Sequence, residues 1–480
     1  MLLETLTSTR TDVAGTDSSI ISKTPVLADA KTKAEATRSA LLTASILPTL
    51  LRLAVPTLLV LVAQTAVNIA EAYYVGILGT DALAGAALVF PIYMLMVMMS
   101  NAGFGSGVAS SVARAIGSGR SADDVLFHAM VLAILIGALF TLGSITGGAS
   151  LYRMLGARGD ALTAAVNYSD YLFAGAIPVW IVNLQAAALR GSGNVRVPAM
   201  VTLIGAIVTI PLSPLLIFGL GPIPGLGIGG AGLALGLYYT TAMVFLLHYM
   251  RAGRGGLTFR VLPLSARLFA DILKVGLPTA LNAAVTNLSV IFVTGAVGTL
   301  GTTAIAGYGL AARLDYIMGP LLFGVGTATL TMVGINVGAG QITRARRIAW
   351  TSGIVGLLLA GATGLLISVF PAIWLRFFSG DATVVYDGAT YLHIVAPAYG
   401  ALGFGYVAQF AAQGAGRAMW PLVASGVRIL IAAGGAWLAI GPLGLGMTGL
   451  AGMVAASLVA YAAVCALVLG SSALWRKEGR

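Results

Sequence analysis

Glu71 is the residue whose type and surroundings point most directly to chemistry. It is the only charged residue between Arg52 and Asp81, within an otherwise largely apolar run. Low-dielectric surroundings disfavour a charged carboxylate, so Glu71 could bind a proton and release it when water or a cation arrives. Gln64 and Asn68 precede it by seven and three residues, which places the three polar side chains on one face of a helix. We therefore expect this face to line a cavity and Glu71 to exchange protons; a static ion pair with an arginine is the alternative.

Thr209 and Ser213 form a second polar pair, at a spacing that puts both hydroxyls on the same side of a helix. Pro211 and Pro214 lie between and beside them. Because proline has no backbone N–H, each proline leaves one carbonyl of the preceding turn without its helical donor. Free carbonyls and hydroxyls together could bind a coupling cation or water, since irregular backbone is tolerated where it lines a cavity. A simple packing kink is the alternative.

Polar and charged residues of the second half of the chain are candidates for the wall of a substrate cavity. They are Asn282, Thr286, Asn287, Arg313, Asp315 and His393. Arg313 and Asp315 are two residues apart and do not face each other on a helix, so each needs a partner elsewhere. Asp315 could receive a cationic group, and either residue could equally be a strut between helices. A single histidine within an apolar helix, such as His393, is more often a packing residue than a ligand, and Arg428 lies similarly deep in its own segment.

The composition shows which elements must position these residues. The 480-residue chain is 58% hydrophobic and only 9% charged, whereas a water-soluble domain has about 25% charged residues. Its solvent must therefore be a lipid bilayer, which a helix of about 20 apolar residues can cross. Twelve such helices are predicted, at residues 50–77, 82–113, 124–149, 161–188, 198–219, 229–250, 269–297, 303–334, 349–375, 384–411, 420–441 and 448–474. We therefore expect an all-α polytopic membrane protein.

The basic residues indicate how the chain is oriented. The net charge is +11, but the arginines fall in alternate short loops rather than in one patch with aromatic residues, which argues against nucleic acid as a partner. Under the positive-inside rule these loops and both termini face the cytoplasm. We therefore expect a multi-pass protein of the plasma membrane, the inner membrane in a bacterial cell. Cys465 is the only cysteine, which excludes an intramolecular disulfide and a cysteine metal site; no cofactor or metal is expected.

The chain repeats itself across a central basic loop. Pro56 and the segment GILGTDALAG at 76–85 recur 222 residues later as Pro278 and GTLGTTAIAG at 298–307. Each copy has six spans, so both enter the membrane in the same direction, and a two-fold axis along the membrane normal should relate them, with a binding site between them. The expected organisation is a disordered cytosolic tail (1–45), a six-helix bundle (46–252), a cytoplasmic linker (253–268) and a second six-helix bundle (269–480).

These features resemble the multidrug and toxic compound extrusion (MATE) family of secondary transporters. The resemblance rests on an acid shortly before VGILGT, on RGSG at 190–193 followed by Pro198, and on GINVGAG at 334–340. It covers residues 45–475 and implies two six-helix bundles around a V-shaped cavity, with substrate leaving by alternating access in exchange for sodium ions or protons. Glu71 stands where the family commonly has Asp. Thr209 and Ser213 replace the Asn and Asp of many bacterial members, and the acids that some members carry in spans 7 and 10 are missing.

The resemblance predicts a transporter and not an enzyme, and the missing acids favour protons over sodium as the coupling ion. We expect a proton-coupled antiporter that exports organic cations or drugs, with Glu71 as the coupling residue and sodium as the less favoured ion. The expected partners are a cationic, amphipathic small molecule and membrane lipids, and the protein is expected to be a monomer. A flippase for lipid-linked oligosaccharides or other lipids, from the same superfamily, is the alternative transporter. An intramembrane transferase would need a convergent catalytic set, for which His393 and Asp315 are the only pair available.

Overall fold

The computed structural model describes residues 35–222, 224–253 and 256–476, and the elements in these ranges are helices. The first half contains α2 (Ile46–Ile77), α3 (Thr80–Met98), α4 (Gly105–Gly117), α5 (Asp123–Met154), α6 (Gly159–Ala174), α7 (Ala176–Gly191), α8 (Arg196–Phe218) and α9 (Ile228–Arg251). The second half contains α10 (Ala266–Gly298), α11 (Thr302–Gly338), α12 (Ile342–Val369), α13 (Pro371–Arg376), α14 (Ala382–Val395), α15 (Tyr399–Gly414), α16 (Met419–Ile429), α17 (Gly435–Ile440), α18 (Gly446–Gly470) and α19 (Ser472–Trp475).

The apolar segments form helices long enough to cross a membrane. Within the described ranges there are 11 such helical spans, and the bent pair α6–α7 brings the number to 12. Large apolar side chains are exposed along them, for example Leu139 (68%) and Ile145 (66%) in α5. Such exposure is costly in water and favourable in lipid. The expectation of an all-α polytopic membrane protein is therefore confirmed.

The fourth and tenth spans are broken at equivalent places. In the first half, α6 and α7 meet at Gly175 with a bend of 47°. In the second half, a single 3₁₀ turn at Ala396–Ala398 separates α14 from α15. Gly175 and Pro397 are 222 residues apart, the offset of the sequence repeat. At Gly175 a Cβ would lie 3.0 Å from the Cα of Gly236, and Pro397 lacks the N–H that a continuous helix needs. The two halves thus repeat the same interruption by different local means.

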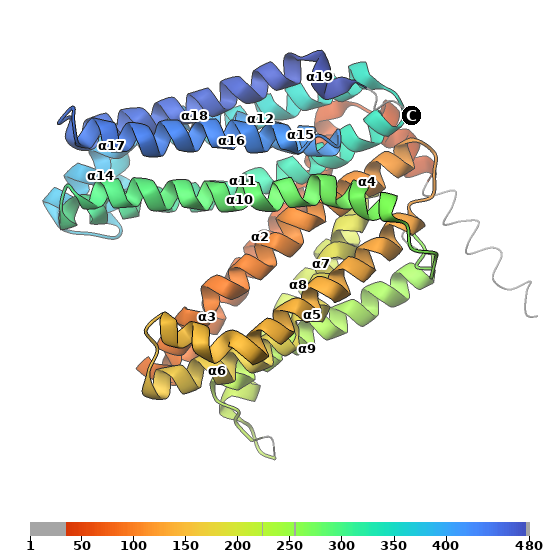
Figure 1. The fold of residues 1–480 in the computed structure, drawn as a ribbon, viewed down its shortest axis with the longest axis horizontal. Coiled ribbons are helices and arrows are strands. Elements are labelled where there is room, and N and C mark those ends of the chain that lie inside the picture. The colour runs from red at the N-terminus through yellow and green to blue at the C-terminus, as the bar shows by residue number, and fades with distance from the viewer. Residues whose placement is uncertain (1–34, 223, 254–255, 477–480) are drawn as a thin grey trace, which may run out of the picture.

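Figure 1 shows the helices arranged as the two arms of a V, with α2 to α9 in one arm and α10 to α18 in the other. The arms meet at one end, where α4 packs against α10 and α11. We call this the joined end and the opposite one the open end. At the joined end a Cβ on Gly117 would lie 2.1 Å from the carbonyl oxygen of Ile335, and one on Gly338 would lie 2.2 Å from that of Arg114. Gly117 and Gly338 are 221 residues apart, as are Arg114 and Ile335, so the contact confirms the predicted pseudo-symmetry.

A short helix ahead of the first span lies across the joined end. Residues 35–43 are helical, although we expected them to belong to a disordered tail. Arg38 donates a hydrogen bond of 2.9 Å to the carbonyl oxygen of Gly117 in the first half, and Asn336 of the second half donates one of 3.2 Å to that of Leu41. The Leu41 side chain is buried, which explains why this part of the segment is ordered. The rest of the expected tail, 1–34, lies outside the described residues.

Two apolar core clusters hold the molecule together, one mainly in each arm. Each cluster also includes residues of the other half, such as Leu50 and Ala113 in the second arm's cluster and Phe323 and Phe410 in the first arm's. In the first arm the fully buried Trp180 packs edge-on against Phe104, with ring centroids 5.5 Å apart. In the second arm Tyr391 packs edge-on against Tyr308 at 5.2 Å. Close-packed interiors of this kind resist deformation. The side chains on the facing surfaces of the arms are therefore supported by closely packed interiors.

Candidate functional site

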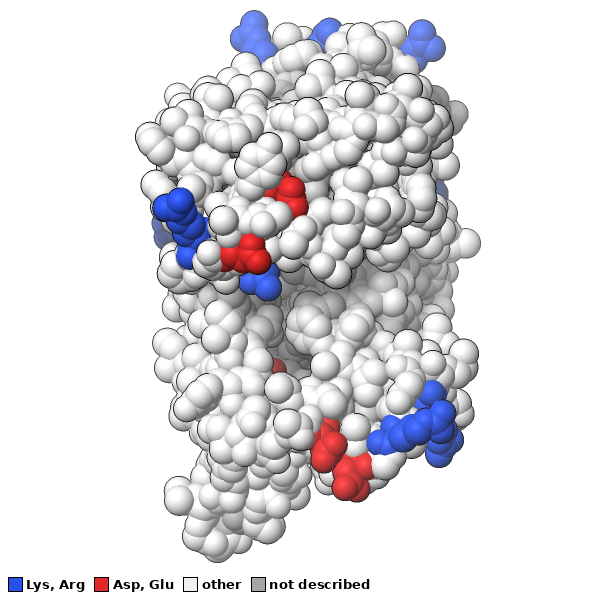
Figure 2. All heavy atoms as spheres, turned by 90° about the vertical axis from the view of Figure 1, so that its left-hand side faces the viewer, with Lys and Arg blue, Asp and Glu red and all other residues white. Residues whose placement is uncertain are grey.

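A cavity of about 530 Å³ lies between the two arms. Its walls come from α2, α3, α8 and α9 of the first half and from α10, α11, α15, α16 and α18 of the second. Figure 2 looks at the open end of the V and shows the hollow between the arms. Its walls are mostly uncharged, one acidic group is visible inside it, and the other charged side chains lie around it. Drug-sized molecules bind in cavities of this volume.

The cavity wall combines aromatic rings with amides. The rings belong to Tyr93, Tyr238, Tyr239, Phe323, Tyr406, Phe410 and Tyr461. The amides belong to Gln64, Asn68, Asn101, Asn282, Asn287, Gln409 and Gln413. Among the lining residues that the structure describes, Arg428 is the only charged one. Such a wall offers stacking surfaces and many weak hydrogen-bonding groups, together with a single positive charge.

The cavity brings together residues that the sequence singled out in both halves. Gln64, Asn68 and Thr209 of the first half and Asn282, Thr286 and Asn287 of the second half line it. The Asn282 amide donates a hydrogen bond of 2.9 Å to Oε1 of Gln409, which fixes its orientation across α10 and α15. The wall residues of α2 follow the predicted helix face as far as Asn68.

Glu71 lies one turn beyond Asn68 in α2 but is not among the cavity-lining residues. It is partly buried, and its Oε1 accepts a hydrogen bond of 3.5 Å from the phenol of Tyr168 in α6. Tyr93, whose side chain does line the cavity, lies within electrostatic reach of the carboxyl group. Within the described part of the chain no arginine or lysine is at ion-pair distance from Glu71. The carboxyl group therefore sits among tyrosines of the first arm, next to the cavity.

Thr209 and Ser213 are both buried in α8, which continues through Pro211 and Pro214 as one helix. Each side chain is 3% exposed, and neither hydroxyl has a hydrogen-bond partner among the residues described. Only Thr209 reaches the cavity. A buried hydroxyl without a partner is costly, so both groups are available to a small polar ligand. No group of three His, Cys, Asp or Glu side chains that could hold a metal ion is found in the described ranges.

Two residues expected in the cavity lie away from it. Arg313 is exposed, and its guanidinium carbon is 5.2 Å from the centre of the Phe378 ring. His393 is also exposed, and its Nδ1 is 2.7 Å from the carbonyl oxygen of Ser368 at the end of α12. Both therefore contact other parts of the second half, and neither is among the residues that line the cavity. Asp315 is in α11, but its side chain lies outside what the structure describes.

Two polar residues of the cavity wall are associated with π-helical turns, which sequence spacing did not predict. Asn101 lies within the turn Met99–Phe104, and its Oδ1 accepts a hydrogen bond of 2.8 Å from Arg190. Arg428 comes two residues before the turn Leu430–Gly434. A π turn adds a residue to the helical repeat and often marks a functional site. Regular helical spacing therefore could not predict that these residues face the cavity. The only indication in the sequence was that they are polar residues within apolar segments.

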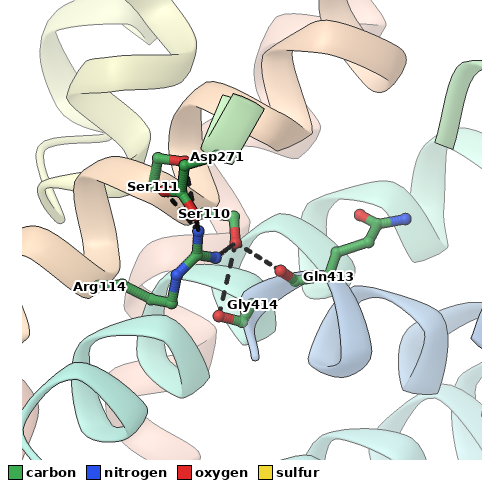
Figure 3. Close-up of polar contacts among 6 residues, drawn as sticks. All are labelled: Ser110, Ser111, Arg114, Asp271, Gln413 and Gly414. Atoms are coloured by element: carbon green, nitrogen blue, oxygen red, sulfur yellow. Dashed lines mark hydrogen bonds and ion pairs between the residues drawn. The ribbon is translucent and has the colours of Figure 1, made fainter. Parts of the chain in front are cut away.

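At the joined end Arg114 of α4 connects the two arms. Nη2 of Arg114 lies 2.8 Å from both carboxylate oxygens of Asp271 in α10. The guanidinium also donates to the hydroxyls of Ser110 and Ser111 on its own helix. Ser110 in turn donates to the carbonyl oxygen of Gln413 in α15, as Figure 3 shows. This cluster ties α4 to two helices of the other arm at the end where the arms meet.

Comparison with known proteins agrees with this fold. The MatE family model matches residues 56–215 and 278–438. The FAD transporter of Shewanella oneidensis is 28% identical over 400 residues, which cover 82% of this chain and 88% of that protein. A solved structure of a MOP superfamily transporter from Pyrococcus furiosus matches with a TM-score of 0.81 and 26% identity. The match covers 91% of this chain and 98% of that one, and the binding pocket of that protein is described as having reverse polarity. An outward-facing multidrug resistance MATE family transporter matches with a TM-score of 0.80 at 25% identity, over 90% and 98%.

The two family matches fall one in each half of the chain. They begin at Pro56 and Pro278, and so reproduce the 222-residue offset of the sequence repeat. Together they cover more than half of the chain. The helical spans, the V of two pseudo-symmetric arms and the cavity between them agree with these matches. The chain is therefore a multi-pass membrane transporter that belongs to the MATE family.

Proposed function

We propose that the protein is a proton-coupled antiporter that exports small amphipathic molecules by alternating access. The observation that carries the proposal is a cavity between two arms that are joined at only one end. A site between two repeat units can be exposed to each side of the membrane in turn when the units rock against each other. In this proposal residues 46–252 and 269–480 move as the two units, linked by 253–268.

The joined end is proposed to face the cytoplasm. Arg114, Arg190, Arg344 and Arg417 belong to the helix ends and loops on this side, and positive charge in such loops favours the cytoplasmic side. Both termini then lie inside the cell, and the protein resides in the plasma membrane. The described conformation has its cavity open toward the outside, which is the state from which an exporter releases substrate and takes up protons.

Glu71 is proposed as the proton-binding group. Its carboxyl group is partly buried at membrane depth, and the described contacts provide a phenol from Tyr168 but no cationic partner. A carboxyl group in such surroundings is cheaper to hold in its protonated form. It exchanges that proton when the arms move and the local water content changes. Gln64, Asn68, Thr209 and Ser213 are polar groups on the neighbouring helices α2 and α8, and they are proposed to carry water or a coupling ion near it.

The substrate is proposed to be a molecule of drug size. The compared proteins include a multidrug resistance transporter and an FAD transporter. A cavity of about 530 Å³ with rings and amides on its walls suits compounds of that kind. The organic cations expected from the resemblance would be favoured by a carboxylate on the wall, and the lining residues described by the structure include none. We therefore propose a substrate that is amphipathic and of drug size, and this proposal leaves its charge open.

The test is transport by purified protein in proteoliposomes. An imposed pH gradient should drive accumulation of a fluorescent substrate by the natural protein, with no requirement for sodium. Glu71→Gln should insert and fold normally but lose gradient-driven transport, because glutamine cannot release a proton. Asp160→Asn is the matched control, since Asp160 is an exposed acid at the first turn of α6. Normal gradient-driven transport by Glu71→Gln, or transport that stops when sodium is removed at fixed pH, would contradict the proposal.

A further inference from the structure

We infer that the central cavity binds an organic anion with an aromatic body, and that Arg428 is the residue that recognises the negative group. The inference rests on the proposed transport function, since it names the substrate class of the same cavity. It differs from the cationic substrate expected from the sequence, and the reasons lie in the charge and the pairing of the lining residues.

The first reason is the state of the Arg428 guanidinium. Its Nε is buried and has no acceptor among the described residues. The described contact of the group is with an aromatic face: its central carbon lies 5.9 Å from the centre of the Tyr461 ring, another lining residue. A guanidinium remains charged, carries five N–H donors and cannot accept a hydrogen bond. A ring face interacts with the charge but accepts hydrogen bonds only poorly. The Nε donor of Arg428 is therefore not hydrogen-bonded to any described residue, and an anionic ligand in the cavity would supply an acceptor for it.

The second reason is the sign of the cavity. Arg428 is its only charged lining residue within the described part of the chain, and the other polar lining groups are amides and hydroxyls. A charge at membrane depth with low-dielectric walls exerts a field that is little screened. This field attracts anions and repels cations. Asp315 is the acid that would change the sign of the cavity if its side chain entered it. It lies in α11 between the lining residues Ala312 and Met318, and its side chain is not among those that the structure describes.

The third reason is the chemistry of the other residues that line the cavity. Tyr406 and Phe410 of α15 present aromatic rings to the same cavity. Oε1 of Gln413 and Oδ1 of Asn282 are buried acceptors without a partner among the described groups. Rings of this kind stack on a planar molecule, and free amide oxygens accept hydrogen bonds from ring N–H groups. A carboxylate or phosphate binds the flat fork of an arginine through two parallel bonds. The wall thus fits a planar aromatic or heteroaromatic compound that carries one such group.

The experiment compares two dyes of nearly the same shape and opposite charge. Fluorescein is an anion at pH 8, and rhodamine 123 is a cation built on the same three-ring body. Binding of each dye to the full-length protein in neutral detergent is followed by fluorescence anisotropy. The natural protein should bind fluorescein at least about tenfold more tightly than rhodamine 123. Arg428→Gln should weaken fluorescein binding by about tenfold or more, the effect expected for loss of a charge-assisted hydrogen bond. Arg428→Lys, which keeps the charge, should lose less.

Control variants distinguish an effect on dye binding from an effect on protein stability or on proton coupling. Arg376→Gln removes an exposed arginine of α13 and should leave both affinities unchanged. Thermal unfolding of each variant identifies a purely structural role for Arg428, in which stability falls while dye preference persists; that outcome would overturn the inference. Dye binding in detergent is measured without a pH gradient, so failure of proton coupling in liposomes leaves the anion site standing.

Three further results would overturn the anion site. The first is a natural protein that prefers rhodamine 123, above all if Asp315→Asn abolishes that preference. The second is Arg428→Gln with unchanged affinity for both dyes. The third is displacement of fluorescein by phosphatidylglycerol added to the micelles at low mole fraction, since the phosphate of a lipid headgroup would then be the natural partner of Arg428. The comparison of dyes on the natural protein needs no variant, so the inference stays testable if Arg428→Gln fails to fold.

Discussion

The two halves of the chain share one framework and place opposite charges in it. Glu71 of the first half corresponds, at the 222-residue offset, to Val293 of the second, which is buried and apolar. Arg428 of the second half corresponds, at an offset of 223, to Gly205 of the first. A Cβ on Gly205 would lie 1.9 Å from the ring of Tyr238, which occupies the space that a larger side chain would need. The acid is thus present in one copy and the cavity's cation in the other.

This difference separates two demands on the molecule. Rocking of two arms needs matched packing where they touch, and there the copies have remained alike, as at Gly117 and Gly338. The proposed ion coupling and substrate recognition depend on single chemical groups, Glu71 and Arg428, and at these two positions the copies differ. Glu71 and Arg428 form no ion pair in the part of the chain that the structure describes. Positions that the framework requires should therefore respond alike to substitution in both halves, and positions that carry chemistry should not.

The largest effect is expected where the halves are alike. Gly117→Ala and Gly338→Ala each place a Cβ 2.1 or 2.2 Å from a backbone carbonyl oxygen of the other arm, which cannot move aside without shifting a helix. Each variant should lower the free energy of unfolding by about 1–3 kcal/mol, a typical cost of overpacking, and the two losses should be similar. Thermal unfolding in detergent measures both. Gly143→Ala is the control, because a Cβ there meets nothing within 4 Å; clearly unequal losses would argue against a shared framework.

A smaller effect is expected where the halves differ in shape. Gly205→Ala forces the Tyr238 ring to move, and a ring yields more easily than backbone, so a loss of about 1 kcal/mol is expected. Combining Gly205→Ala with Tyr238→Ala should cost less than the sum of the two single changes, because the obstacle is gone. Arg428→Ala at the equivalent position creates no overlap and should act on ligand binding instead. Chemical unfolding of the four variants provides the comparison, and strict additivity of the pair would refute the steric account.

The smallest effect is expected at two equivalent tyrosines. Tyr168 donates to Glu71, whereas Tyr391, at an offset of 223, packs against Tyr308 in the half without that acid. Tyr168→Phe should slow proton-driven transport a few-fold, since the hydrogen bond is long and a typical one contributes about 0.5–1.5 kcal/mol. Tyr391→Phe should leave the dependence of transport on the pH gradient unchanged. Initial rates at several imposed gradients would show the contrast, and equal responses would remove Tyr168 from the coupling site.

The fold could be predicted from the sequence because its signals are long and repeated. Apolar runs gave the spans, and Pro56 and Pro278 fixed the offset between the copies. The breaks at Gly175 and Ala396–Ala398 were not predicted, because they depend on close approach between helices and on one proline among many.

The site was only partly predictable. Helical spacing puts Gln64 and Asn68 on one helix face, and both line the cavity. Spacing does not show, however, which face of an isolated helix meets its neighbours. For that reason His393 was expected in the cavity and is exposed beside Ser368 instead. Arg428 was noticed only as an arginine deep within its apolar segment. The sequence does not show that the other lining residues described by the structure are uncharged. The roles assigned to Glu71, Thr209 and Ser213 stay predictions.

The helix at residues 35–43 has a consequence for the speed of the transport cycle. It is bonded through Arg38 to one half and through Leu41 to the other, on the side where the halves touch. Any movement that separates the halves at this end must first break these two hydrogen bonds, which we call the clasp. The helix itself is not among the residues that line the cavity. The clasp therefore adds a kinetic barrier that is independent of what is carried. Deleting the residues ahead of the first span would therefore change the rate at which the two arms move, without changing which substrates are transported.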